Sequence, residues 1–142
     1  MINAVADASV AVKWFLPPTE AERDHDRAGA FLQGVKTGRI VLREPPHWIA
    51  EVAAVLSRLV PTGAHREIAD LYAMRIAVVE NVEFYTTASQ LAISLDQHLF
   101  DTLYHAVALL VPGCTLVTAD ERYYRRARKL GAISLLADFD PS

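Results

Sequence analysis

Residues 99–118, LFDTLYHAVALLVPGCTLVT, join an apolar helix to an apolar strand and decide the expected fold. Residues 100–111 have the length and apolar density of a buried helix, and Pro112–Gly113 ends that helix at once. Residues 114–118, CTLVT, have the composition of a strand that is covered on both faces. A buried helix followed directly by a buried strand predicts a unit of parallel α/β structure.

The rest of the chain repeats this alternation of short apolar runs and helical segments. Strands are expected over residues 2–6, 39–44, 82–85 and 133–136, and helices over residues 9–16, 20–38, 46–60, 65–79, 86–97 and 120–131. Such alternation is typical of a parallel sheet with helices on both faces. We therefore expect a three-layer α/β/α sandwich with a mainly parallel central sheet, folded as a single domain over residues 1–142.

The composition is that of an ordinary soluble protein rather than a membrane or disulfide-rich one. Of the 142 residues, 52% are apolar and 22% are charged, and the net charge of −3 neither favours nor excludes a nucleic-acid partner. The longest apolar run, residues 106–111, is far shorter than the ~20 residues of a membrane span. The start, MINAVADASV, lacks a basic stretch, and Cys114 has no second cysteine to pair with, so we expect a cytoplasmic protein without a signal peptide.

Four acidic side chains stand at positions where a charge is costly or unusual. Asp7 and Asp120 come just after predicted strands, whereas Glu51 and Asp101 lie on helices whose apolar faces must pack on the sheet. Ligands of parallel α/β proteins bind beyond the carboxyl ends of the strands. If the four carboxylates meet there, like charges repel, and some must take up protons or bind cations. Oxygen ligands of this kind suit Mg²⁺ or Mn²⁺ better than Zn²⁺.

Each acid also has an ordinary structural interpretation that the sequence leaves open. Asp7 or Ser9 could cap a helix, Asp101 could be an N-cap, and Glu51 could pair with His47 one helical turn earlier.

Two further local interpretations concern Asp101 and Asp120. His98 and His105 lie three residues before and four residues after Asp101, which leaves a zinc site as an alternative. Thr118 and Glu121 have the T-x-x-E spacing of a capping box, which would place Asp120 in the first helical turn.

Four segments resemble, in order, the successive motifs of PIN-domain nucleases, and most closely those of VapC-type toxins from toxin–antitoxin pairs. They are VADASVAVKWF at residues 5–15, PPHWIAEVAAVL at 45–56, FDTLYHAVAL at 100–109 and LVTADERYYRRA at 116–127. The ordered set spans nearly the whole chain. The two histidines beside Asp101 are not part of that pattern.

The resemblance implies a function, a cofactor and partners. Asp7, Glu51, Asp101 and Asp120 match the family's catalytic and metal-binding acids, Thr118 matches a residue that supports the site, and Ser9 is a further supporting candidate. Such proteins are Mg²⁺- or Mn²⁺-dependent endoribonucleases. They cut structured RNA, often transfer RNA, by attack of metal-activated water, which leaves a 5′-phosphate and a 3′-hydroxyl. They are inhibited by a VapB-type antitoxin and commonly form homodimers.

A basic cluster that follows Asp120 provides the candidate RNA contacts. It consists of Arg122, Arg125, Arg126, Arg128 and Lys129. Helical spacing puts Arg122, Arg126 and Lys129 on one face, where they could bind phosphates, and Tyr123 or Tyr124 could stack on a base. An ordinary solvated helix face is the alternative.

Four other functions can be weighed against this one. A haloacid-dehalogenase-type phosphatase should carry D-x-D after its first strand, whereas this chain has Asp7–Ala8–Ser9, and a receiver domain should carry paired acids there. Ser9 has no identifiable base, which argues against a serine hydrolase. A catalytically silent PIN-like interaction module is the rival of a different class.

Overall fold

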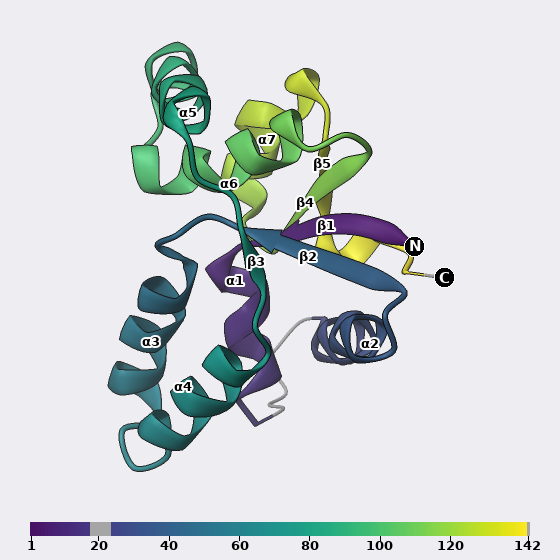
Figure 1. Ribbon diagram of the computed structural model, residues 1–142, viewed down its shortest axis with the longest axis vertical. Coiled ribbons are helices and arrows are strands. Elements are labelled where there is room, and N and C mark those ends of the chain that lie inside the picture. Colours follow the sequence, from purple (N-terminus) through teal and green to yellow (C-terminus); the bar gives the residue numbers. More distant parts are fainter. Residues whose placement is uncertain (18–23, 142) are drawn as a thin grey trace.

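The computed structural model describes residues 1–17 and 24–141. Within these residues, five parallel strands form one sheet in the order β3-β2-β1-β4-β5 (Figure 1). The strands are β1 (Ile2–Ala6), β2 (Ile40–Glu44), β3 (Ala77–Val78), β4 (Cys114–Thr118) and β5 (Ile133–Leu135). β1 is central and pairs with β2 on one side and β4 on the other, so the direction of the chain's winding reverses at β1. In parallel α/β sheets this reversal point is where ligands bind.

Helices cover both faces of the sheet, as expected for a three-layer sandwich (Figure 1). In the described part of the chain the α-helices are α1 (Ala8–Ala11), α2 (His25–Lys36), α3 (Trp48–Leu59), α4 (Ala64–Ala73), α5 (Val82–Leu95), α6 (Leu99–Leu110) and α7 (Glu121–Ala127). Short 3-10 turns are η1 (Val12–Trp14), η2 (Arg128–Leu130) and η3 (Leu136–Asp138). None of the described helices combines the length and apolarity that crossing a bilayer requires.

The central strand shows how the residues select the layers. Ala4 and Ala6 belong to the apolar cluster on the α2 side, whereas Val5, between them, belongs to the cluster on the α5–α6 side. This alternation is the period of two expected when a strand is covered on both faces. On the α2 side the packing is close: a methyl group added at Gly34 would lie 2.7 Å from Ile40, so the helix approaches the sheet where glycine permits it.

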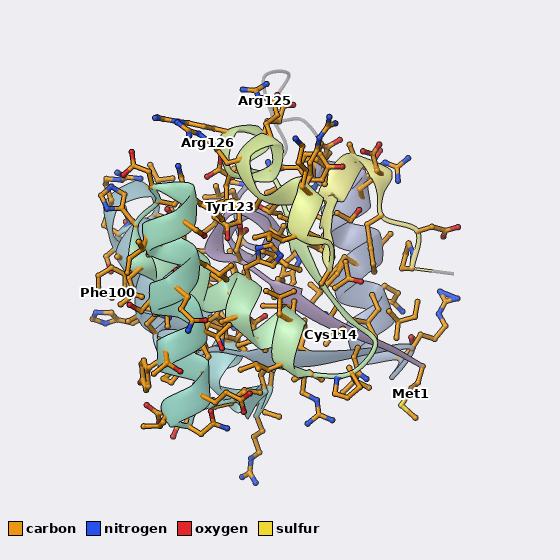
Figure 2. All side chains as sticks on the ribbon, turned by 90° about the horizontal axis from the view of Figure 1, so that it is seen from above. Met1, Phe100, Cys114, Tyr123, Arg125 and Arg126 are labelled. Carbon is orange, nitrogen blue, oxygen red and sulfur yellow. The ribbon has the colours of Figure 1, made fainter. Side chains whose placement is uncertain are left out.

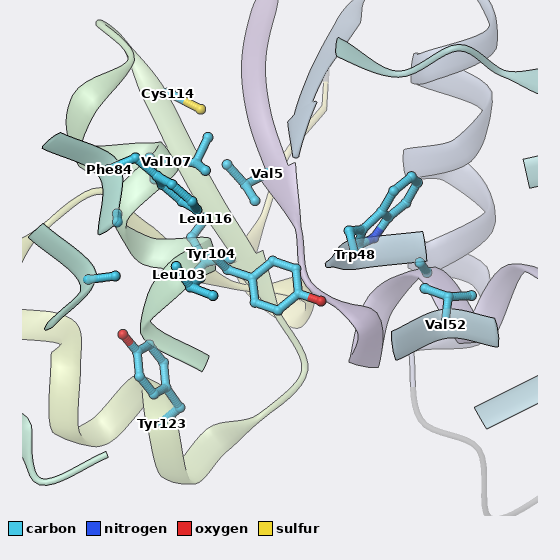
Figure 3. Close-up of a cluster of buried hydrophobic side chains, with 14 of the residues drawn as sticks. Val5, Trp48, Val52, Phe84, Leu103, Tyr104, Val107, Cys114, Leu116 and Tyr123 are labelled. Carbon is cyan, nitrogen blue, oxygen red and sulfur yellow. The ribbon is translucent and has the colours of Figure 1, made fainter. Parts of the chain in front are cut away.

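The larger cluster lies between the sheet and the α3, α5 and α6 helices (Figure 3). The ring of Tyr104 extends from α6 toward Trp48 and Val52 on α3 and ties the two sides of this cluster together. Cys114 begins β4 in the same cluster, 5% exposed, and burial raises the pKa of its thiol to about 11. Polar groups therefore also lie in this cluster, namely the hydroxyls of Tyr104 and Tyr123 and the thiol of Cys114.

Two sequence-based expectations about elements were wrong. Residues 82–85, expected as a strand, begin helix α5, because the Asn81 side chain caps that helix by accepting the N–H of Phe84 at 2.8 Å. The third strand is instead Ala77–Val78, which lies within the helix expected over 65–79. The helix expected over 20–38 is observed as His25–Lys36, and its expected residues 20–23 lie outside the described residues.

Candidate functional site

Asp7 directly follows β1 and is held by two hydroxyl groups. Ser9 donates to one oxygen of its carboxylate, and Thr118, the last residue of β4, donates to the other. Ser9 in turn accepts the N–H of Ala119 at 3.0 Å, so the carboxyl ends of β1 and β4 are joined through Asp7. The expected helix cap is not formed by this carboxylate, because Asp7 is the N-cap residue of α1 without a side-chain cap bond.

The charge on Asp7 is destabilised by its surroundings. Burial is the main cause and the negative charge of Asp120 adds to it, so the pKa of Asp7 is raised to about 6 despite the two hydroxyl donors. Neutral hydroxyl groups orient a carboxylate but do not neutralise it. A cation bound here would therefore relieve an existing electrostatic cost.

Asp120 sits across from Asp7 at the start of α7. Its side chain accepts the N–H of Tyr123 at 3.0 Å, so Asp120 itself is the N-cap of that helix. The capping box expected between Thr118 and Glu121 was wrong, because Thr118 lies two residues too early and instead accepts the N–H of Asp120 at 3.0 Å. Thr118 thereby contacts both Asp7 and Asp120.

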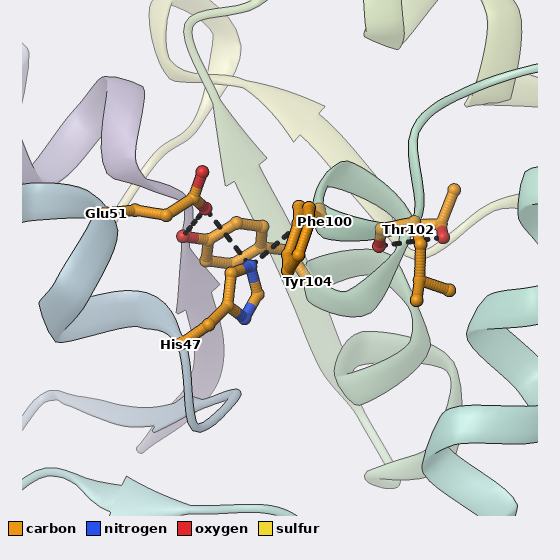
Figure 4. Close-up of polar contacts among 6 residues, drawn as sticks. His47, Glu51, Phe100, Thr102 and Tyr104 are labelled. Carbon is orange, nitrogen blue, oxygen red and sulfur yellow. Dashed lines mark hydrogen bonds and ion pairs between the residues drawn. The ribbon is translucent and has the colours of Figure 1, made fainter.

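Glu51 enters the site from α3 and is partly compensated by its neighbours (Figure 4). Tyr104 donates its hydroxyl to Glu51 Oε1, and His47 Nε2 lies 3.1 Å from the same oxygen. His47 Nε2 is also 2.9 Å from the carbonyl oxygen of Phe100. Burial acts to raise the pKa of Glu51, but the bonds from His47 and Tyr104 and the charge of His47 outweigh it and lower that pKa. The expected local pairing of Glu51 with His47 is therefore observed.

Asp101 lies in the first turn of α6 and not at its cap, since His98 is the N-cap residue. Burial is the first cause that raises the pKa of Asp101, followed by the charges of Glu51 and Asp120, while His98 and His47 act in the opposite direction. Asp101 thus lies within electrostatic range of two of the other three acids. This coupling joins the helix-borne and strand-end parts of the site.

His105 belongs to the core and is separate from any zinc site with His98 and Asp101. It is fully buried, with Nε2 2.8 Å from the carbonyl oxygen of Gly131 and Nδ1 3.0 Å from the hydroxyl of Tyr123. Burial lowers the pKa of His105, so the neutral ring donates from Nε2 and accepts at Nδ1. Both ring nitrogens are occupied, which removes the zinc alternative.

An open pocket of about 350 Å³ lies between the start of α6 and the start of α7. Its lining residues are Asp96, Gln97, His98, Asp101, Asp120, Arg122 and Tyr123. The volume is within the range of about 300–1000 Å³ that small-molecule sites occupy. Two of the four predicted acids therefore face a space large enough for part of a substrate.

The basic cluster is arranged differently from the expected single helical face. Arg122, which lines the pocket, lies in α7. The α-helix ends at Ala127, and Lys129 lies in the 3-10 turn η2, so its spacing from Arg126 is no longer that of an α-helix. Figure 2 shows Arg125 and Arg126 projecting outward from α7, while Tyr123 lies inside the molecule.

The two tyrosines of α7 have different roles. Tyr123 is 3% exposed and bonded to His105, which makes it unavailable for stacking on a base. Tyr124 is partly exposed and keeps that possibility. The alternative of Tyr123 as a stacking residue was therefore wrong.

The donor chemistry of these residues fits a hard divalent cation. All four side chains offer carboxylate oxygens, and a carboxylate has about four lone-pair sites, so its bonds to hydroxyl groups leave others for a metal. Among residues 1–17 and 24–141, however, no three His, Cys, Asp or Glu side chains are already arranged as a group that could hold a metal ion. The acids are coupled through their charges without forming a preassembled set of ligands.

The structure adds two residues that the sequence reasoning missed. Tyr104 bonds to Glu51, and Glu44, at the end of β2, is a fully buried acid near Asp7. The sequence contained a signal for Glu44, because the strand expected over 39–44 places Glu44 on the same face as the apolar Ile40 and Leu42. Tyr104 follows Asp101 by three residues, which placed it on the same side of α6.

A parallel sheet with carboxylates beside the ends of its two central strands defines an α/β protein with an acidic site at the topological switch point. The sequence profile of the PIN domain matches residues 4–129, and the chain belongs to the PIN domain family. PIN domains are commonly metal-dependent nucleases, many of them acting on RNA. A search of curated proteins found no significant match.

Proposed function

We propose that this protein is a Mg²⁺- or Mn²⁺-dependent endoribonuclease and the VapC-type toxin of a type II toxin–antitoxin pair. Its substrate would be structured RNA such as transfer RNA, and a VapB-type antitoxin and a homodimeric state belong to the same proposal. The observation that carries it is the electrostatic coupling of Asp7 to Asp120 and of Asp101 to Asp120 and Glu51. This coupling supports a single site formed by acids that are far apart in the sequence.

The four carboxylates have the central role in this proposal. Asp7, Glu51, Asp101 and Asp120 would hold the cation, which when bound would activate water and stabilise negative charge on the phosphate. Ser9 and Thr118 orient the Asp7 carboxylate through hydrogen bonds. No side chain is needed as a nucleophile, because hydrolysis transfers the phosphoryl group to water.

Basic residues would direct the negatively charged RNA toward this acidic site. Arg122 lines the pocket beside Asp101 and Asp120, where a guanidinium can bind a phosphate next to the one that is cut. Arg126 and Lys129 are both exposed and would contact the RNA backbone farther out. Tyr124 is the remaining candidate for stacking on a base.

Cleavage of bulk transfer RNA in the presence of Mn²⁺ tests the enzymatic part of the proposal. The parent protein should cut, and Asp101→Asn should not, while retaining the parent's circular dichroism spectrum. Asp96→Asn is the matched control, because Asp96 lines the same pocket and loses the same charge. Equal cleavage by the parent and Asp101→Asn would remove Asp101 from the site, and a parent that leaves RNA intact with either metal would favour the silent interaction module.

Expression in a bacterial host tests the toxin part. Growth should stop when the parent is expressed alone and continue when the open reading frame immediately upstream is expressed with it. Asp101→Asn should be harmless in both cases. Normal growth during expression of an RNA-cutting parent would separate the two parts, since the nuclease would stand and the toxin role would not.

A further inference from the structure

Glu44 is the most anomalous buried group outside the four predicted acids. Its side chain is 0% exposed, and its Oε2 accepts the N–H of Ala6 at 2.9 Å. Its Oε1 has no hydrogen-bond partner among residues 1–17 and 24–141. Buried side-chain oxygens normally have a partner, so a half-satisfied carboxyl in this position requires an explanation.

The sheet register shows what the bond between Glu44 and Ala6 replaces. β1 and β2 pair with Ile2 beside Ile40 and Ala4 beside Leu42, and the recorded pairing stops there. Continued by two residues, this register would bring Ala6 beside Glu44. The two strands instead separate, and the Glu44 carboxyl takes the N–H that another rung of the ladder would have satisfied.

Glu44 therefore joins three strands at the edge that carries the site. Its main-chain oxygen accepts the N–H of Val79 at 2.9 Å on the β3 side, while its side chain reaches Ala6 on the β1 side. The next N–H along β1, that of Asp7, bonds to the carbonyl oxygen of Val117 in β4. The Ala6 N–H is thus bonded on the β2 side and the Asp7 N–H on the β4 side. These two bonds fix the peptide groups before and after the Ala6 α-carbon.

Stability alone does not account for a carboxyl here. A leucine of similar size would fill this buried position without burying an unbonded oxygen. Burial, together with the negative charge of Asp7, raises the pKa of Glu44. What a leucine would lack is the acceptor for the Ala6 N–H, which the strand end needs after it separates from β2.

We propose that Glu44 is a positioning residue, which sets the Asp7 carboxylate for metal binding by fixing the Ala6 peptide through its buried carboxyl. The inference rests on the proposed metal-dependent function, because it concerns the placement of one of that site's four acids. Sites of this kind require their ligands to be held within about 0.5 Å of the productive geometry. A strand end with a free N–H would not hold Asp7 to that precision.

Mn²⁺ affinity, measured by electron paramagnetic resonance of free Mn²⁺, tests this role in the full chain. Glu44→Gln keeps a carbonyl oxygen for the Ala6 N–H and should bind Mn²⁺ within about twofold of the parent. Glu44→Leu removes the acceptor and should bind at least about tenfold more weakly, in line with the 10–100-fold cost of losing a group that orients a ligand. Leu42→Ala is the control, because Leu42 lies two residues earlier on the same buried face and has no such bond.

Amide hydrogen exchange at Ala6 provides a readout that does not depend on the metal. Exchange should be slow in the parent and in Glu44→Gln and at least about tenfold faster in Glu44→Leu. Glu44→Asp, which is one methylene shorter, should behave like Glu44→Leu and serves in its place if the leucine variant does not fold.

The possible results separate this role from the proposed function. If Glu44→Leu, or Glu44→Asp in its place, folds and binds Mn²⁺ as tightly as the parent, the positioning role is wrong and the metal site stands. If Leu42→Ala weakens Mn²⁺ binding as much, the effect is general destabilisation and the role is again wrong. If the parent itself does not bind Mn²⁺, the metal site fails and the role of Glu44 fails with it.

Discussion

Asp7 and Glu51 are two carboxylates of one candidate site, yet their environments are opposite. Asp7 stands at a strand end, where the hydroxyl groups of Ser9 and Thr118 and the N–H of Val10 lower its pKa less than burial raises it, so that pKa is about 6. Glu51 stands on a helix beside His47, and its pKa is lowered despite its partial burial. The groups that stabilise the Asp7 charge are thus uncharged, whereas Glu51 has a histidine beside it.

This contrast indicates where a cation would gain most. A positive ion beside Asp7 would offset the cost of an ionised group among other acids, while beside Glu51 it would compete with an imidazole that is already there. We therefore expect Asp7 to dominate metal binding and Glu51 to modulate it. Four measurements bear on that ranking.

The largest expected effect is on RNA cleavage. Asp7→Asn should reduce kcat/KM by about 1000-fold or more, because Asp7 has no histidine to offset its charge as Glu51 has, whereas Glu51→Gln should cost only about tenfold. Initial rates on one purified transfer RNA at saturating Mn²⁺ give both numbers. Similar losses in the two variants would mean that the different environments of Asp7 and Glu51 do not determine how much each contributes to cleavage.

The second effect is on stability in the absence of metal. The pKa of Asp7 rises from 3.8 to about 6 on folding, so the folded state holds this proton more tightly than the unfolded state does. Protonation of Asp7 contributes about 3 kcal/mol to the free energy of unfolding. This contribution is fully present below about pH 3.8 and is lost as the pH rises through 6. The free energy of unfolding can be measured with urea in EDTA. Between pH 4 and pH 8, that of Asp7→Asn should therefore increase relative to that of the parent by up to about 3 kcal/mol.

Addition of Mg²⁺ provides the control for that measurement. A ligand that binds only the folded state stabilises it, so the parent should recover stability at pH 8 and Asp7→Asn should not. Parallel pH profiles of the two proteins in EDTA would contradict the raised pKa of Asp7.

The third effect concerns RNA binding at the pocket that Asp101 and Asp120 line. Arg122 shares a pocket with Asp101 and Asp120, whereas Arg125 projects outward from the same helix. In an Asp7→Asn background that cannot cut, Arg122→Ala should weaken RNA binding by about five- to tenfold and reduce the salt dependence by about one phosphate contact. Arg125→Ala should change binding by less than about twofold, and equal effects would argue against a specific phosphate contact in the pocket.

The smallest effect concerns the partner of Glu51. His47→Ala removes a hydrogen bond and a charge that lower the pKa of Glu51, so that pKa should rise. The acidic limb of the kcat/KM profile should then move to higher pH, with a loss of about two- to threefold near pH 5.5 and none at pH 8. His65→Ala, on the exposed surface of α4, should leave the profile unchanged.

Much of the fold followed from patterns that depend on neighbouring residues in the chain. The buried helix of residues 100–111 and the strand CTLVT were predicted because apolar density and Pro112–Gly113 fix them locally. Residues 82–85, VEFY, have strand-like composition, but the Asn81 cap made them the first turn of a helix. A two-residue strand such as Ala77–Val78 exists only because β2 lies beside it, which no local pattern reveals.

The candidate site was predicted in the same uneven way. The four acids could be named because each interrupts an apolar segment or follows a strand. The role of Glu44 depends on how far β1 and β2 stay paired, and that of His105 on the distance from α6 to Gly131. Both are properties of tertiary packing, so the residue type alone did not distinguish a core histidine from a metal ligand.

The buried thiol of Cys114 has a practical consequence for spectroscopy. With a pKa of about 11 and 5% exposure, it is almost entirely un-ionised at neutral pH and shielded from maleimide reagents. A cysteine introduced at the exposed position Arg125 would therefore take a fluorophore or spin label selectively in the otherwise native chain. Distance measurements on bound RNA need no cysteine-free background.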